Sequence, residues 1–281
     1  MRAFLAQLKW EFVRLVNRPR TWLAFWLSLV FEVCASVLLK APGVRAAIAR
    51  DVWKMHEQWK DIFSGLTTAA HILGESVTII GAIGITLVAA EIVAGENETG
   101  TLRMIFCRPA SRGHVLAAKL VVCTAYAMVV VLYIAVTSLL VGLLFEGRGN
   151  LVMLAPHEGI MGAFHFEEGL RRYALAVPLI WFTAISGMLW PFFFSCTGMK
   201  STTAAVLALF LLAADDILRT TPQTAVISPH CVTTRMLSWR QAFNDEIPWS
   251  RIERNYEQLA VIDAALLAGA VVAFRRMATR R

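Results

Sequence analysis

The 281-residue chain lacks the short motifs that mark most enzymes. It has no GxxxxGK[ST] loop to enclose nucleotide phosphates, and the nearest run, Gly198 to Thr202, lacks glycines in the required places. Neither an HExxH zinc helix nor a GxSxG nucleophile turn occurs. The six histidines are scattered. The sequence therefore predicts no metal site, no cofactor bound by this chain and no catalytic residue.

Charge is also scarce. Only 17% of residues are charged and 57% are hydrophobic, which gives a mean hydropathy of +0.59. Soluble domains carry about 25% charged residues. The net charge of +7 comes without a basic block that contains interleaved aromatics, so it does not indicate nucleic-acid binding. In a membrane protein such an excess reflects orientation and contact with anionic lipid.

The apolar residues fall into six long runs, which predict an all-α polytopic membrane protein. Runs near twenty apolar residues are long enough to cross a bilayer as helices. We found no internal repeat, so residues 1–281 are expected to form a single transmembrane domain. The last two runs are short, and neighbouring protein is expected to shield their ends. The expected spans are about 22–39, 76–94, 120–145, 173–196, 202–218 and 259–274.

Three segments outside the spans have predicted places. Residues 1–20 show apolar side chains at helical spacing between basic ones, which predicts a helix in the membrane interface. Residues 41–63 predict an outer amphipathic helix, which rests either on the interface or on another loop. The long segment 219–257 is expected outside, as a cap or as a loop that dips back toward the membrane.

Six spans place both termini on one side of the membrane. Five Lys or Arg residues precede Thr21, and four more lie at or beyond Arg275. The positive-inside rule puts these termini in the cytoplasm, which predicts a multi-pass protein of the cell membrane.

Ionisable residues in or near the spans form a second set of candidates. Buried charges are costly in a membrane and often functional. These residues either line a proton or cation path, or pair with one another and with arginine near the span ends. The possible intramembrane polar site comprises Glu32, His71, Glu75, Asp215, Asp216 and Asp263.

The link between the second and third spans, residues 96–114, has a composition that a plain connector does not need. Gly100 can end one helix, Thr99 or Thr101 can begin a short one, Pro109 can stop it, and Ser111 can cap the next. The short helix is expected on the cytoplasmic face, where it would insert into a groove of a partner. A solvated loop is the alternative. The apolar residues expected on its surface are Leu102, Ile105 and Phe106.

This link resembles the signature of type-two ATP-binding-cassette (ABC) exporter permeases. Those proteins show an acid-rich stretch, Gly-Thr-Leu, then Pro-x-Ser-Arg and a later lysine. Residues 90–95 also resemble subfamilies that include the permease of the nitrous-oxide-reductase maturation exporter. Asn97, Thr99 and Cys107 depart from the pattern. The matching residues are Glu96, Glu98, Gly100, Thr101, Leu102, Pro109, Ser111, Arg112 and Lys119.

The resemblance implies a mechanism and partners. Two permease copies, or this chain and a paralogue, would sit on two cytoplasmic ATP-binding subunits that hold ATP and Mg²⁺. The link would be the coupling element that receives force from the ATPase. Two alternatives remain, namely an ion-coupled secondary transporter that uses the buried acids and a membrane assembly factor. The sequence does not identify the substrate.

Overall fold

The computed structural model describes residues 2–46, 63–102, 112–155, 160–221, 223, 226 and 228–279. Within this part, six helices are long and apolar enough to cross a membrane. The predicted six-span helical fold is thereby confirmed. The six are α2 (Pro19–Leu39), the continuous α4 (Gly65–Glu75), η1 (Ser76–Gly81) and α5 (Ala82–Glu98), α7 (Arg112–Glu146), α8 (Phe166–Cys196), α9 (Ser201–Thr220) and α11 (Trp249–Thr279).

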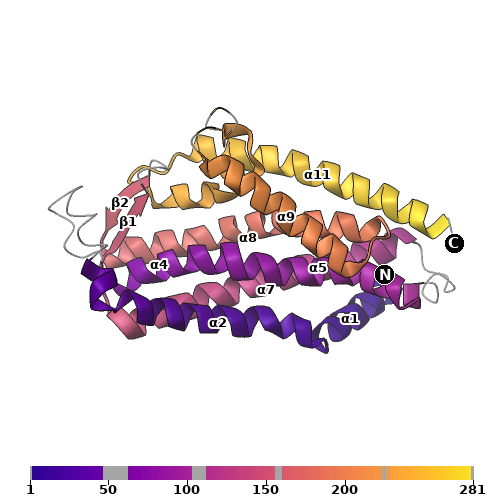
Figure 1. Ribbon diagram of the computed structural model, residues 1–281, viewed down its shortest axis with the longest axis horizontal. Coiled ribbons are helices and arrows are strands. Elements are labelled where there is room, and N and C mark those ends of the chain that lie inside the picture. The colour runs from indigo at the N-terminus through magenta and orange to yellow at the C-terminus, as the bar shows by residue number, and fades with distance from the viewer. Residues whose placement is uncertain are drawn as a thin grey trace.

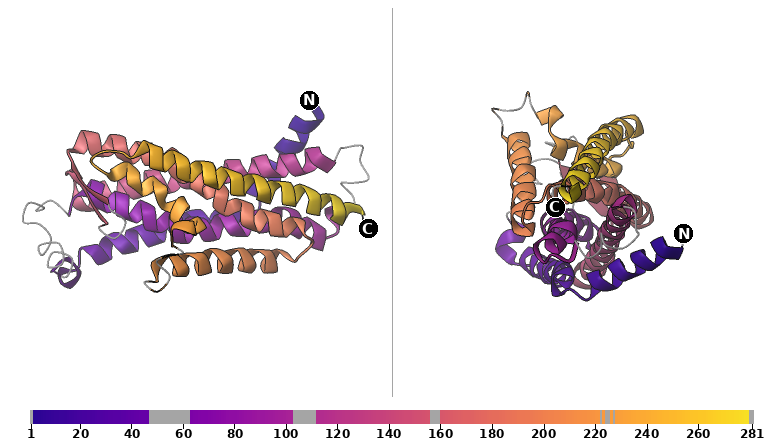
Figure 2. Two further views of the ribbon diagram at one scale, coloured as in Figure 1. Left: turned by 90° about the horizontal axis from the view of Figure 1, so that it is seen from above. Right: turned by 90° about the vertical axis from the view of Figure 1, so that its right-hand side faces the viewer.

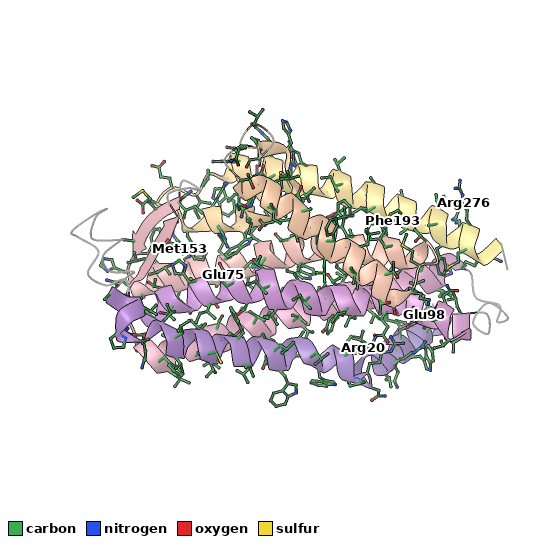
Figure 3. All side chains as sticks on the ribbon, in the orientation of Figure 1. Arg20, Glu75, Glu98, Met153, Phe193 and Arg276 are labelled. Carbon is green, nitrogen blue, oxygen red and sulfur yellow. The ribbon has the colours of Figure 1, made fainter. Side chains whose placement is uncertain are left out.

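The spanning helices run lengthwise along an elongated bundle (Figure 1). The hairpin of β1 (Leu151–Ala155) and β2 (Ile160–Phe164) lies at one end, and both chain termini lie at the other. Figure 3 shows Arg20, Glu98 and Arg276 toward that same terminal end, with Met153 at the hairpin end. Helix α1 (Arg2–Val16) projects sideways from the bundle (Figure 2).

Small residues allow the helices to approach closely, as is common in membrane bundles. A Cβ atom added to Gly84 of α5 would lie 2.4 Å from the Ala24 Cβ of α2. A Cβ atom on Gly142 of α7 would lie 2.4 Å from the Gly65 carbonyl oxygen of α4. Glycine at these two positions therefore sets the spacing of the central helices.

Polar caps fix the hairpin end of the bundle. The Ser64 side chain accepts a hydrogen bond from the Thr67 amide at 3.2 Å, which caps α4. The Thr67 hydroxyl in turn accepts from the Val152 amide of β1 at 2.8 Å. These contacts attach the hairpin to the second span.

Several observed boundaries differ from the expected ones. The second spanning helix begins at Gly65 rather than near 76, and α7 begins at Arg112 rather than near 120. Helix α11 has 31 residues and starts at Trp249, ten residues before the expected apolar span. The helices continue beyond the apolar runs through polar flanking turns, which the hydropathy pattern does not mark.

Other segments contain structure that the sequence did not predict. The hairpin of residues 151–164 is one example. Residues 219–257 contain η4 (Ser228–His230), α10 (Val232–Met236), η5 (Leu237–Phe243) and the start of α11. Trp239 and Phe243 of η5 are buried in the main core. Most of the amphipathic helix predicted over 41–63 falls on residues 47–62, outside the described part of the chain.

Candidate functional site

The predicted coupling link starts from a structured helix end. Helix α5 finishes at Glu98, and Gly100 takes a left-handed backbone conformation with φ of 72°. The Thr99 hydroxyl donates to the Gly95 carbonyl at 3.0 Å, and the Thr101 hydroxyl donates to the Glu96 carbonyl at 3.3 Å. These bonds satisfy carbonyls that the helix end leaves without partners. The path of the chain into the link is therefore fixed.

A buried group of charged side chains lies at the same end of the bundle. The Lys119 Nζ of α7 lies 2.7 Å from a Glu96 carboxylate oxygen of α5 and 2.8 Å from a Glu11 oxygen of α1. The relative exposures of the three side chains are 0% for Lys119, 1% for Glu96 and 3% for Glu11. One lysine therefore joins the N-terminal helix to both helices that flank the link.

Arg14 of α1 completes this group, which we call the Lys119 cluster: Glu11, Arg14, Glu96 and Lys119. Its guanidinium forms an ion pair with the same Glu96 oxygen that Lys119 contacts. The cluster holds two acids and two bases, so its formal charge is zero. Buried charges are tolerated when they are paired in this way, whereas removal of one partner leaves an uncompensated charge.

The pKa of Glu11 is raised above its ordinary value of 4.5. Burial is the largest cause, because it disfavours the charged carboxylate. The Lys119 charge opposes this shift, and the Glu96 charge adds to it. The contact between α1 and the bundle therefore contains a group whose proton uptake is linked to docking.

Two further contacts tie α5 to its neighbours at this end. The Glu98 carboxylate accepts a hydrogen bond from the Ser201 amide at the first turn of α9. Lys200, the N-cap residue of that helix, supplies no side-chain cap. Glu98 therefore acts as the acceptor there, and its charge suits the positive end of a helix dipole. Glu91 also pairs with Arg18 at 3.4 Å and Arg20 at 3.3 Å.

The structure changes the interpretation of two residues in the predicted coupling set. Leu102 was expected on the surface of the link but is buried in the main core, and Glu96, which matches the family signature, is buried as well. Glu98 contacts α9, while Arg112 is exposed at the start of α7. The remaining members, Ile105, Phe106, Pro109 and Ser111, lie outside the described residues.

The predicted intramembrane polar residues do not gather at one place. The acid pair on α9 has local partners, since Asp215 accepts from the Thr233 amide at 2.7 Å and Asp216 pairs with Arg219 at 2.9 Å. Asp263 of α11 accepts from the Ser186 hydroxyl of α8 at 2.7 Å. Asp215 and Asp216 are therefore paired with neighbouring protein groups, whereas the second carboxylate oxygen of Asp263 is buried without a hydrogen-bond partner among the described residues.

The other three polar residues lie on α2 and α4. His71 and Glu75 are exposed on α4, and both interact with Arg240 of η5. The distance from the Arg240 Nη2 to Glu75 is 3.6 Å, which indicates a loose ion pair. Glu32 is buried on α2 (0% exposed), and no hydrogen-bond partner is found for it among the described residues.

Sequence reasoning missed the role of the N-terminal helix. Glu11 and Arg14 were seen as charges on an interfacial helix, and Lys119 only as the last residue of a signature. The one available signal was an acid and a base one turn apart on the same side of that helix. That spacing is common on solvated helices, so it did not reveal a buried partner on α7.

Comparisons with known proteins add a family and a distant relative. Residues 7–210, well over half of the chain, match the model of the family described as "ABC-2 family transporter protein". The uncharacterized protein YhcI of Bacillus subtilis (strain 168) is 26% identical over 140 residues. That match covers 49% of this chain and 44% of YhcI, so the chain spans less than half of the relative. No solved structure matches.

Proposed function

This chain belongs to the ABC-2 family of transporter proteins, and we propose that it is the permease subunit of an ATP-driven exporter. In this proposal a separate cytoplasmic subunit binds and hydrolyses ATP, because the 281 residues contain no P-loop motif. Two permease copies, or this chain and a paralogue, form the membrane part. Both termini and the link after α5 face the cytoplasm. Within this proposal, the resemblance of residues 90–95 favours a subfamily that includes the nitrous-oxide-reductase maturation permease.

The observation that carries this proposal is the Lys119 cluster. It ties the end of α5, the start of α7 and the N-terminal helix into one unit beside the link. The Glu98 contact adds the start of α9 to that unit. A push on the link would therefore displace ends of several spanning helices together. Such a push changes transport only if ATP binding favours one bundle conformation over the other.

The test is to co-express the chain with the ATP-binding subunit encoded nearest to it and to purify the pair into lipid nanodiscs. We expect a stable complex whose ATPase activity depends on the permease. Gly100→Pro should weaken the complex and the ATPase activity while leaving membrane insertion intact, because proline cannot adopt the positive φ of Gly100.

Gly113→Ala is the matched control. Gly113 lies at the far end of the link, in the first turn of α7, and an added Cβ there meets nothing within 4 Å. Alanine also favours the helix, so this variant should behave as wild type. The proposal fails if the Gly100→Pro variant retains full binding and activity, or if the chain transports its substrate without any ATP-binding subunit.

A further inference from the structure

Glu32 lies inside the membrane-spanning part of α2, away from the Lys119 cluster. It is the fourteenth of 21 residues, so it lies about 20 Å from the start of the helix and about 10 Å from its end. Its side chain is fully buried, and neither carboxylate oxygen has a hydrogen-bond partner among the residues that the structure describes. An ionised carboxylate without a partner in such a place is strongly disfavoured.

The neighbouring polar groups do not supply the missing partner. Thr137 of α7 lies close enough to Glu32 for a side-chain hydrogen bond, but its single hydroxyl proton is directed at the Tyr133 carbonyl at 2.8 Å. Tyr173 of α8 donates to the Ala135 carbonyl at 2.8 Å. Both hydroxyl protons are thus directed at backbone oxygens. Each hydroxyl oxygen keeps lone pairs that can act as acceptors.

Two serines extend this oxygen-rich environment. Ser138 of α7 lies 2.7 Å from the Tyr173 hydroxyl. Ser36 follows Glu32 by one helical turn on the same side of α2, is 1% exposed, and its hydroxyl lacks a hydrogen-bond partner in the described part of the chain. The group therefore combines one carboxylate and several hydroxyl oxygens.

We propose that Glu32, with the hydroxyls of Ser36, Thr137 and Tyr173, forms an intramembrane binding site for one small monovalent cation. A hard cation such as Na⁺ prefers oxygen ligands, and a proton on the carboxylate meets the same need for positive charge. No charged residue interacts with Glu32 among the described residues. The titratable groups beside it are the tyrosines Tyr133 and Tyr173.

Charged groups on the other helices that pack against α2 have partners elsewhere. Glu75 on α4 lies near Arg240, and η1 contains no ionisable residue. Of the acids of α5, Glu91 and Glu96 are paired with arginine or lysine at the terminal end of the bundle, and Glu98 accepts from the Ser201 amide. The cation at Glu32 would therefore balance a charge that the protein itself leaves unbalanced.

The test measures thermal unfolding of the purified full-length permease in detergent, without an ATP-binding subunit. It therefore succeeds or fails independently of the proposed exporter function. Na⁺ is exchanged for N-methyl-D-glucamine at constant ionic strength, and the pH is varied in a second series. Ligand that binds only the folded state raises the unfolding temperature. We expect such a rise with Na⁺, or on acidification if the proton is the ligand. In Glu32→Gln the Na⁺ response should be lost, and the response to acidification should be smaller but not absent, because Glu11 also takes up a proton in the folded state.

Glu75→Gln is the matched control, because it removes an acid that is 56% exposed and already paired. It should keep the cation response of wild type. If Glu32→Gln does not fold, Tyr173→Phe removes one oxygen ligand with little change in packing and should weaken the response. A wild-type unfolding temperature that ignores both Na⁺ and pH overturns the proposal. The proposal is also overturned if the unfolding temperature of Glu32→Gln responds to Na⁺ and pH as strongly as that of wild type. Where Glu32→Gln does not fold, the same comparison is made between wild type and Tyr173→Phe.

Discussion

Replacement of Lys119 by methionine should release the N-terminal helix from the bundle. Methionine has a similar length and no charge, so the fold of α7 is kept while Glu11 and Glu96 lose their shared partner. Arg14 still pairs with Glu96, but Glu11 is left buried without the lysine. Breaking a buried ion pair by removal of one partner costs about 3–5 kcal/mol. The equilibrium constant for docking of α1 onto the bundle should therefore fall by roughly 100- to 3,000-fold, since about 1.4 kcal/mol corresponds to a tenfold change.

The assay is hydrogen exchange of the backbone amides of α1, Arg2–Val16, in lipid nanodiscs. Exchange in α1 should become much faster in Lys119→Met, whereas amides in the middle of α7 should stay protected. Arg20→Met is the control, because Arg20 is 54% exposed and forms a surface pair with Glu91. Such pairs contribute about 0–1 kcal/mol. Equal α1 exchange in wild type and Lys119→Met would refute the claim that this lysine holds the helix.

Three more changes test separate parts of the structure. The free energy of unfolding should fall as the pH rises from near 4.5 through the raised pKa of Glu11, because the folded state binds the Glu11 proton more tightly than the unfolded state. Unfolding temperatures measured across this pH range should vary less in Glu11→Gln than in wild type. Glu98→Ala should cost about 0.5–2 kcal/mol by uncapping α9, seen as faster hydrogen exchange in its first turn. Gly84→Val should lower the unfolding temperature through a clash worth about 1–3 kcal/mol, while Gly113→Val, in open space, should not.

The six-span fold could be predicted because it depends on local composition. Apolar runs of the required length have few uses other than crossing a membrane. The helix ends could not be placed in the same way, because polar turns such as the start of α11 continue a helix without any apolar signal. The β1–β2 hairpin depends on contacts with Thr67 and Phe243, which are distant in sequence.

The buried position of Glu96 could not be read from the sequence. A helix that is half exposed shows an apolar stripe, and a charge outside that stripe is placed on the surface. Helix α5 is buried on most of its circumference, so its pattern contains no such stripe. An acid that follows an apolar run near a glycine then resembles a helix-end surface residue. Only the partner lysine, 23 positions later in the chain, shows that it is interior.

The Lys119 cluster also limits how the link can move. If α5, α7 and α1 moved separately, the paired charges would separate in a buried place, at a cost of several kcal/mol for each lost partner. Movement of the three helix ends as one body keeps every pair intact. We therefore expect a double-mutant cycle between Glu11→Gln and Lys119→Met to give the same coupling energy with and without a bound ATP-binding subunit. A coupling energy that disappears on binding would show that the cluster opens during the cycle.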